Sequence, residues 1–241
     1  MKDINRYFGI FDQLITSGGN FFLAIILSKL LLLDDFGMYS VIWIGIISFG
    51  TLFSSWFASP LLSIGPTLSE SEFNQFVSDL TKQILAALGC LTLILIAVFI
   101  LLDDIFEIEV FILCSSLVPY LLYDFLRRLA MVKERLRSLL VISLCLYGLL
   151  FSACLLYFDG NFLSVTKIIS MSYGVCAILL LVTLRTNFII GKLDRLNSRR
   201  VEFAKWMSYS SLVQFMSGNA VSIASAALLP LAEIGLLRLA Q

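Results

Sequence analysis

Histidine is absent from this sequence of 241 residues, and charged residues make up only 14% of it. Without histidine the chain cannot build a serine–histidine–aspartate triad, an H-E-x-x-H zinc site or a histidine proton relay. A phosphate-binding loop is also missing, because Gly191 and Lys192 are followed by leucine and lack the upstream glycine. We therefore expect no ATP hydrolysis, no other enzymatic activity and no cofactor.

Metal and redox motifs are also scarce. All five cysteines lie inside apolar segments without a C-x-x-C pair, so we interpret them as small buried apolar residues. The acidic segment "DDIFE", which begins at Asp103, looks like half of an aspartate-rich diphosphate–magnesium site. It has no second acidic motif, so acidity at a helix end is the favoured interpretation and we expect no metal site.

Apolar residues dominate instead, at 59% of the chain with a mean hydropathy of +0.96. A soluble domain of this length keeps about a quarter of its residues charged. Apolar stretches of about 20 residues recur, and each is long enough to cross roughly 30 Å of hydrocarbon. Segments such as "ILAALGCLTLILIAVFILL" lack the alternation of barrel strands, so the spans must be helices. The sequence predicts an all-α polytopic membrane protein.

Seven spans follow from the hydropathy pattern. Their approximate bounds are Phe8–Leu33, Phe36–Ile64, Ile84–Leu102, Val110–Leu126, Leu139–Phe158, Val165–Leu184 and Ala204–Leu229. Between the second and third spans, apolar residues at helical spacing follow a capping box from Ser69 to Glu72. We expect a short helix there, lying on the cytoplasmic face of the membrane.

Lysine and arginine are unevenly distributed among the links. They concentrate after the fourth span ("RRLAMVKERLR") and after the sixth ("RTNFIIGKLDRLNSRRVEFAK"), whereas the links after spans one, three and five carry none. The positive-inside rule therefore predicts a cytoplasmic N-terminus. Topology also explains the basic segments, so we expect no nucleic-acid partner.

Polar side chains recur on one face of the first, second and seventh spans. Such groups usually face a bundle interior or a water-filled cavity. Small polar residues also let helices pack closely, which is the alternative for the serines and glycines. The residues that we expect to line a substrate pathway are Gln13, Thr16, Ser17, Asn20, Ser48, Thr51, Ser55, Gln214 and Ser217.

Charged residues near the spans allow a few specific assignments. Asp12, at the flank of the polar face, is the one candidate for ion coupling. Lys29 lies near the outer end of its span, where it can extend to the headgroups. Arg127 and Arg128 follow Asp124 where the fourth span meets the cytoplasm, so either an interfacial ion pair or a lipid phosphate contact is open. The candidates for a phosphate or lipid contact are Lys29, Arg127 and Arg128.

The end of the chain repeats its beginning. Ser217-Gly218-Asn219 matches Ser17-Gly18-Gly19-Asn20 with one glycine fewer, and a further glycine follows each copy, Gly37 and Gly235, at nearly the same distance. The second copy starts after an even number of spans, which predicts a parallel repeat with a substrate site between the halves. The organisation we expect is a six-helix lobe over residues 1–200 and the start of a second lobe over 201–241.

Several segments resemble polysaccharide and O-antigen flippases of the multidrug/oligosaccharidyl-lipid/polysaccharide exporter superfamily. They are "FDQLITSGGNFFLAIILSKLLLLDDFGMYSVIW", "SPLLSIGP", "DFLRRLAMVKERLRSLLVISLCLYGLL" and "KWMSYSSLVQFMSGN", with "LLPLAEIGLLRLAQ" at the end. The resemblance implies two six-helix lobes around a cavity in a bacterial inner membrane. It also implies that an undecaprenyl-diphosphate-linked oligosaccharide is flipped across the membrane by alternating access, driven by an ion gradient or by the substrate gradient.

The partners implied are the lipid bilayer, the lipid-linked oligosaccharide, and a polysaccharide polymerase and glycosyltransferases. A remnant too short to span the bilayer follows Gly235, so we expect a second lobe from the same gene, another chain or a second copy. Two alternatives stay open: a multidrug/ion antiporter of the same superfamily, and a membrane assembly subunit that transports nothing.

Overall fold

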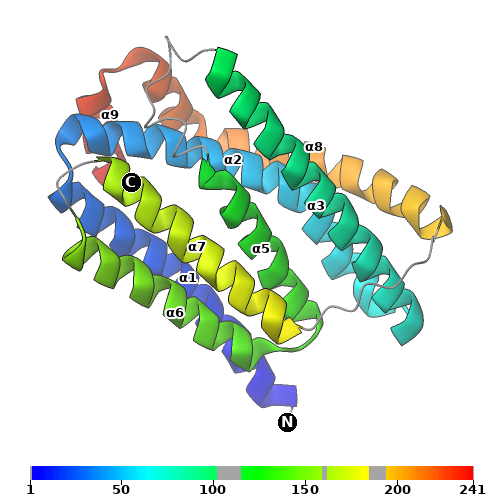
Figure 1. The fold of residues 1–241 in the computed structure, drawn as a ribbon. Coiled ribbons are helices and arrows are strands. Elements are labelled where there is room, and N and C mark those ends of the chain that lie inside the picture. The colour runs from blue at the N-terminus through cyan, green and yellow to red at the C-terminus, as the bar shows by residue number, and fades with distance from the viewer. Residues whose placement is uncertain (1, 102–114, 159–161, 185–193, 241) are drawn as a thin grey trace.

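The computed structural model describes residues 2–101, 115–158, 162–184 and 194–240, and every regular element in these ranges is a helix (Figure 1). The elements are α1 (Lys2–Leu30), α2 (Leu33–Ile64), a 3₁₀ turn η1 (Gly65–Thr67), α3 (Glu70–Leu101), α5 (Leu117–Val132), α6 (Leu136–Leu156), α7 (Phe162–Leu184), α8 (Asp194–Leu228) and α9 (Leu231–Ala240).

Five of these helices are long and apolar enough to cross a membrane. The segments that meet this criterion by length and composition are Tyr7–Leu30, Leu33–Thr67, Glu70–Ala97, Leu136–Leu156 and Ser164–Leu184. The predicted class, an all-helical multi-pass membrane protein, is thereby confirmed. The expected span Val110–Leu126 begins outside the described residues. The expected span Ala204–Leu229 coincides with α8 up to Leu228, and α8 is too rich in serine and amide side chains to join the five. The count of seven stays a prediction.

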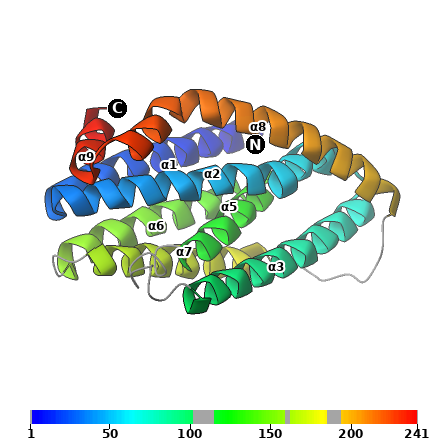
Figure 2. The same cartoon turned by 90° about the horizontal axis from the view of Figure 1, so that it is seen from above.

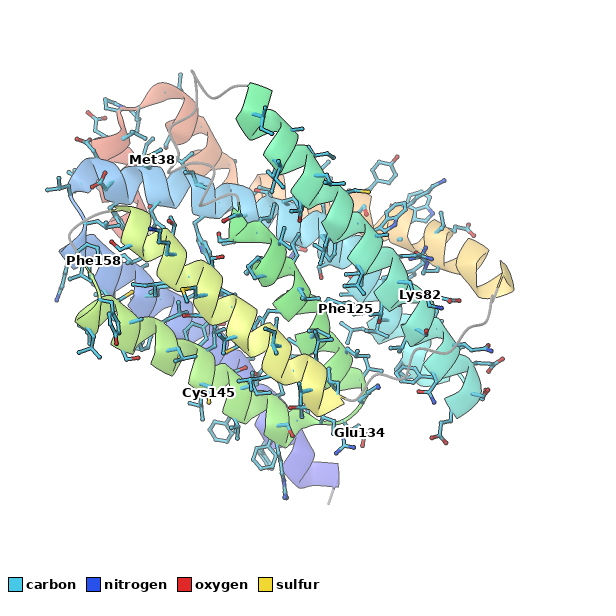
Figure 3. The ribbon with its side chains drawn as sticks, viewed as in Figure 1. Met38, Lys82, Phe125, Glu134, Cys145 and Phe158 are labelled. Atoms are coloured by element: carbon cyan, nitrogen blue, oxygen red, sulfur yellow. The ribbon has the colours of Figure 1, made fainter. Side chains whose placement is uncertain are left out.

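The helices enclose one apolar core. α2 packs on α5, α5 on α7, α7 on α6, and α6 on α1, while α8 lies beside α2 at one edge and α3 at the opposite edge (Figure 2). Side chains such as Leu27, Leu61 and Phe125 are almost completely buried where these helices meet. Figure 3 labels Phe125 on α5, Cys145 on α6 and Glu134 at the turn between these two helices.

Aromatic rings fill the centre of this core. Trp43 on α2 lies 5.7 Å from Tyr120 on α5, measured between ring centroids, and the rings meet edge to face. Tyr173 on α7 contacts Tyr120 and Tyr123 in the same manner, at 5.4 and 5.5 Å. Edge-to-face pairs contribute about 0.5–1.5 kcal/mol each beyond burial, so the cluster holds α2, α5 and α7 together.

The prediction of a short surface helix after the second span is wrong. A single helix, α3, runs from Glu70 to Leu101. Its capping box forms as predicted: the Ser69 amide donates to the Glu72 carboxylate at 3.0 Å, and the Glu72 amide lies 3.5 Å from the Ser69 hydroxyl. Phe76 and Leu80 are buried in the protein core rather than laid on a membrane surface. An amphipathic pattern alone does not distinguish these two apolar environments.

The cysteines divide between the core and the surface. Cys154 and Cys176 are buried, as expected, but Cys90 and Cys145 are exposed, and Cys114 lies outside the described residues. The thiol is apolar enough to face lipid, so its position in an apolar segment does not predict burial within the protein.

The two copies of the repeated sequence contact each other where α9 crosses the start of α2 (Figure 1). A Cβ atom on Gly37 would overlap the carbonyl oxygen of Leu231, and one on Gly235 would lie 3.0 Å from the carbonyl oxygen of Leu33. In each copy the leucine stands four residues before the glycine. The contact is therefore reciprocal, as between two similar segments related by a two-fold axis.

The helix breaks in the two copies also correspond. The interval between α1 and α2 is Leu31 and Leu32, and the interval between α8 and α9 is Leu229 and Pro230. The amide of Leu31 donates to the carbonyl of Leu27, and the amide of Leu229 to that of Ser225. The two breaks are therefore 198 positions apart in the sequence, which is also the separation of Gly37 and Gly235. The backbone turns in the same way in each copy.

Candidate functional site

Two adjacent arginines on α5 face different parts of the molecule. Successive helical residues point about 100° apart, so the side chains of Arg127 and Arg128 leave α5 in different directions. Arg127 is buried and its guanidinium donates to Asp12 on α1, at 2.6 Å from Nη2 and 3.0 Å from Nε. Arg128 is part-exposed and its Nε donates to Asp124, one turn earlier on α5, at 3.1 Å.

The Asp12 carboxylate joins three helices. It is fully buried, and besides Arg127 it accepts a hydrogen bond from the Ser143 hydroxyl on α6 at 2.5 Å. Ser143 in turn lies 3.1 Å from the hydroxyl of Tyr123 on α5, and Arg127 also donates to the Gln13 side chain at 3.2 Å. A buried charge with this many partners is satisfied, so the network fastens α1 to α5 and α6.

Part of the α1 polar face is occupied by α6. The Tyr147 hydroxyl on α6 lies 2.9 Å from the backbone oxygen of Thr16 and 3.0 Å from Oδ1 of Asn20. A Cβ atom on Gly19 would overlap the Tyr147 ring, so glycine is needed for the ring to approach α1. Thr16 and Asn20 therefore take part in helix packing, while Gln13 and Ser17 remain exposed.

A polar pocket of about 230 Å³ lies between α2, α5 and α8. It is lined by Gly50, Thr51, Ser54, Ser55, Ser59, Tyr120, Asp124, Arg128 and Ser211. Across it, Ser55 on α2 and Ser211 on α8 are hydrogen-bonded, with their hydroxyl oxygens 2.6 Å apart. The pocket thus brings one basic group, one acidic group and several hydroxyls together at the edge of an apolar bundle.

The sequence identified this pocket in part. Thr51 and Ser55 line it as members of the predicted pathway, and Ser48 lies one turn before Thr51 on α2. Gln214 and Ser217 on α8 are exposed and do not line it. The expected face therefore does not form one continuous wall.

Tyr120 was missed, although the sequence carried a signal for it. Tyr120, Asp124 and Arg128 are spaced four residues apart, which places them on one face of α5. An aromatic residue one turn before the first member of a charged pair lies on the same face of the helix as that pair. Ser54 and Gly50 on α2 were also missed, and Gly50 is where the Tyr120 ring comes close, since a Cβ there would lie 2.9 Å from Tyr120 Cε1.

The remaining charged candidates lie outside the pocket. Lys29 is exposed in the last turn of α1, at the far end of that helix from Asp12. Within the described ranges no three histidine, cysteine, aspartate or glutamate residues gather in a metal-binding group, and the acidic segment at Asp103 lies outside these ranges.

A second pocket, of about 330 Å³, lies between the end of α2 and the first part of α8. It is lined by Ser63, Ile64, Glu202, Phe203 and Trp206. It contains a carboxylate but no cationic side chain, so it offers no site for a phosphate.

Comparison of the chain with protein-family models, with curated proteins and with solved structures finds no match.

Proposed function

We propose that this protein is a membrane transporter that moves a lipid-linked oligosaccharide carrying phosphate, and that the pocket between α2, α5 and α8 holds part of its polar head. The observation that carries the proposal is the composition of this pocket: one arginine and a row of hydroxyls at the edge of an apolar, membrane-spanning bundle. Polar groups in such a setting are costly and usually belong to a substrate pathway.

Arg128 is the group that we assign to the phosphate. Its bond to Asp124 uses Nε, which leaves the two terminal NH₂ groups for a second anion. Arginine binds phosphate by paired, charge-assisted hydrogen bonds, whereas a part-exposed pair between side chains one turn apart contributes only about 0.3–0.5 kcal/mol. A phosphate can therefore replace or join Asp124 at little cost.

The hydroxyls suit a sugar. Thr51 donates its proton to the carbonyl of Ile47 at 2.8 Å, and the Ser55 hydroxyl has two acceptors within the protein, the Thr51 carbonyl at 2.8 Å and the Ser211 hydroxyl at 2.6 Å. A hydroxyl has one proton, so these side chains offer mainly acceptor lone pairs to a ligand. Sugar hydroxyls supply the matching donors. A pocket of about 230 Å³ is smaller than the roughly 300–1,000 Å³ of drug-sized sites, so it fits one unit of the head.

A multidrug/ion antiporter is less well supported. That function needs a carboxylate that can exchange a cation within the pathway. Asp12 is fully buried and already bonded to Arg127 and Ser143, and Asp124 is paired with Arg128. An assembly subunit without transport activity would have no use for the pocket.

Orientation and location belong to the same proposal. The asymmetry of lysine and arginine among the links favours a cytoplasmic N-terminus. A bacterial inner membrane follows from the chemistry of the proposed substrate, which is assembled on an undecaprenyl lipid.

The test is a flipping assay in liposomes that contain the purified protein and a fluorescent undecaprenyl-diphosphate-linked sugar. We expect protein-dependent movement between leaflets, and a decrease of about tenfold in its rate for Arg128→Gln, which removes the charge and the paired donors. Arg135→Gln is the matched control, because Arg135 is exposed at the start of α6 and outside the pocket. Movement no faster than in empty liposomes, or equal rates for both variants, would contradict the proposal.

A further inference from the structure

The C-terminal helices α8 and α9 are attached to the rest of the protein mainly through α2. α8 packs along α2, and α9 packs on the start of α2 with a smaller contact on α1. Across the pocket, α8 faces α5 through a space rather than through a packed interface. The two helices therefore form a unit, α8–α9, whose position relative to α5 is decided along α2.

One end of this attachment is rigid. At the reciprocal crossing, Gly37 contacts the backbone of Leu231, and Gly235 contacts the backbone of Leu33. Glycine permits this approach because it has no Cβ atom, and backbone atoms have no rotamers through which they can yield. Sliding or separation here would break contacts in both directions at once, so the crossing resists movement.

The other end buries few side chains, because from Arg200 to Ser217 of α8 only Arg200 and Ala204 are buried. Ser55 and Ser211 form a hydroxyl–hydroxyl hydrogen bond beside the pocket, and a neutral bond of this kind contributes only about 0.5–1.5 kcal/mol net. Ser55 has an alternative acceptor in the Thr51 carbonyl at 2.8 Å, so it stays satisfied when Ser211 leaves. Water or a ligand hydroxyl in the pocket can satisfy Ser211.

We propose that the glycine crossing is the fixed end of a hinge and the Ser55–Ser211 bond is its latch. The α8–α9 unit swings about the crossing, and separation of Ser211 from Ser55 opens the pocket between α2, α5 and α8. Gly37 and Ser55 are 18 residues apart on α2, or about 27 Å at 1.5 Å per residue. A rotation of about 10° at the crossing therefore displaces Ser211 by about 5 Å, a typical hinge movement.

The hinge itself is inferred from the geometry of the helices alone. Its role in gating a substrate rests on the proposed function. It is tested by distances between pairs of spin labels, measured by electron–electron double resonance on the full chain in liposomes, with all native cysteines replaced. One pair, Leu32→Cys with Leu236→Cys, flanks the crossing on exposed positions. The other, Arg135→Cys with Lys205→Cys, reports the separation of α8 from the α5–α6 turn, and both positions are exposed.

We expect a narrow single distance for the pair at the crossing and a broad or double distribution for the pair at the pocket end. Ser211→Ala should shift the second distribution towards longer distances and leave the first unchanged. Equal widths at both ends, or no shift with Ser211→Ala, would overturn the hinge.

Glycine variants give an independent test of the fixed end. Gly37→Ala should broaden the crossing distance, because its Cβ overlaps the Leu231 carbonyl oxygen, whereas Gly45→Ala on the same helix faces open space and should not. An unchanged narrow distance in a folded Gly37→Ala variant would contradict the fixed crossing. If that variant does not fold, the two label pairs in the protein with its native glycines still test the fixed crossing.

The outcomes separate the hinge from the proposed function. The distances require no substrate, so movement at the pocket end without flipping would refute the transport proposal and keep the hinge. Flipping by a protein whose pocket end does not move would refute the hinge and keep the transport proposal.

Discussion

The two sides of α5 carry the same chemical pair in opposite settings. On the side of α1 and α6, Arg127 and Asp12 are buried and bonded across helices, and the Ser143 hydroxyl donates a further hydrogen bond to the Asp12 carboxylate. On the side of α2 and α8, Arg128 and Asp124 lie on one helix, part-exposed beside a pocket. An arginine and a carboxylate form each pair, so the environment makes the difference.

That difference separates a structural pair from one that can bind. A buried pair is costly to break, since the partner left behind is an uncompensated charge in a medium of low dielectric constant. A part-exposed pair is screened, competes with water, and can exchange its partner for a ligand. We therefore assign stability to Arg127 and binding to Arg128, and variants on the two sides of α5 should differ accordingly.

The largest effect is expected for Asp12→Ala. It leaves the guanidinium of Arg127 buried without its carboxylate, which should lower the free energy of unfolding by about 3–5 kcal/mol. Unfolding in mixed micelles with increasing dodecyl sulfate measures this. Asp124→Ala is the matched control, with an expected loss of about 0.3–0.5 kcal/mol. Equal losses for the two variants would remove the distinction between the sides.

The next effect concerns binding on the open side. Arg128→Lys keeps the charge but loses the planar pair of donors, so affinity for an undecaprenyl diphosphate probe in nanodiscs should fall about tenfold, or about 1.4 kcal/mol. Thermal stability should stay unchanged, because Arg128 bonds only within its own helix turn. An unchanged affinity, or a loss of stability as large as that of Asp12→Ala, would argue against a binding role.

A smaller effect is expected for Tyr123→Phe on the buried side. It removes the hydroxyl that lies 3.1 Å from Ser143 and should cost about 0.5–1.5 kcal/mol of unfolding free energy. Tyr209→Phe, on the exposed face of α8, is the control and should be neutral. A neutral Tyr123→Phe would mean that the network ends at Ser143.

The smallest effect should come from replacing both buried charges together. Asp12→Leu with Arg127→Met removes the pair without leaving either charge alone, so the unfolding free energy should stay within about 1 kcal/mol of the native value. Arg127→Met by itself should lose about 3–5 kcal/mol, because Asp12 then remains charged and buried. A double variant as unstable as the single one would show that more than the ion pair holds α1 to α5.

The sequence was sufficient to predict the helical membrane class and most helix positions, because a long apolar segment in lipid must satisfy its backbone hydrogen bonds internally, as a helix does. It was insufficient where one pattern fits two environments. Phe76 and Leu80 pack in the core although their spacing equally suits a membrane surface. Asp12 was assigned to ion coupling, and its partner Arg127 stands 115 positions away, a pairing that periodicity within one span cannot reveal.

The site was predicted unevenly for the same reason. Thr51 and Ser55 follow from one helical face, but the pocket also needs Ser211 from α8 and Tyr120 from α5, and their meeting depends on how three helices pack. Asn20 fits the polar face of α1 equally well, yet Tyr147 occupies it. Helical periodicity gives the face of a residue, and tertiary packing decides what covers that face.

The length of α3 sets the depth of Arg128 in the bilayer. Its 32 residues measure about 48 Å, against about 30 Å of hydrocarbon, and after Lys82 they carry no charge. We infer that the hydrocarbon boundary of the proposed transporter falls near Lys82, within the candidate span Glu70–Ala97, and that the start of α3 projects beyond it. A Cβ on Gly65 would lie 3.2 Å from Phe73 and 3.4 Å from Val132, so the end of α5 is level with that projecting start. In the proposed transporter Arg128, one turn inward from Val132, therefore lies in the layer of lipid phosphates, where a phosphate carried by a lipid reaches it by sideways diffusion alone.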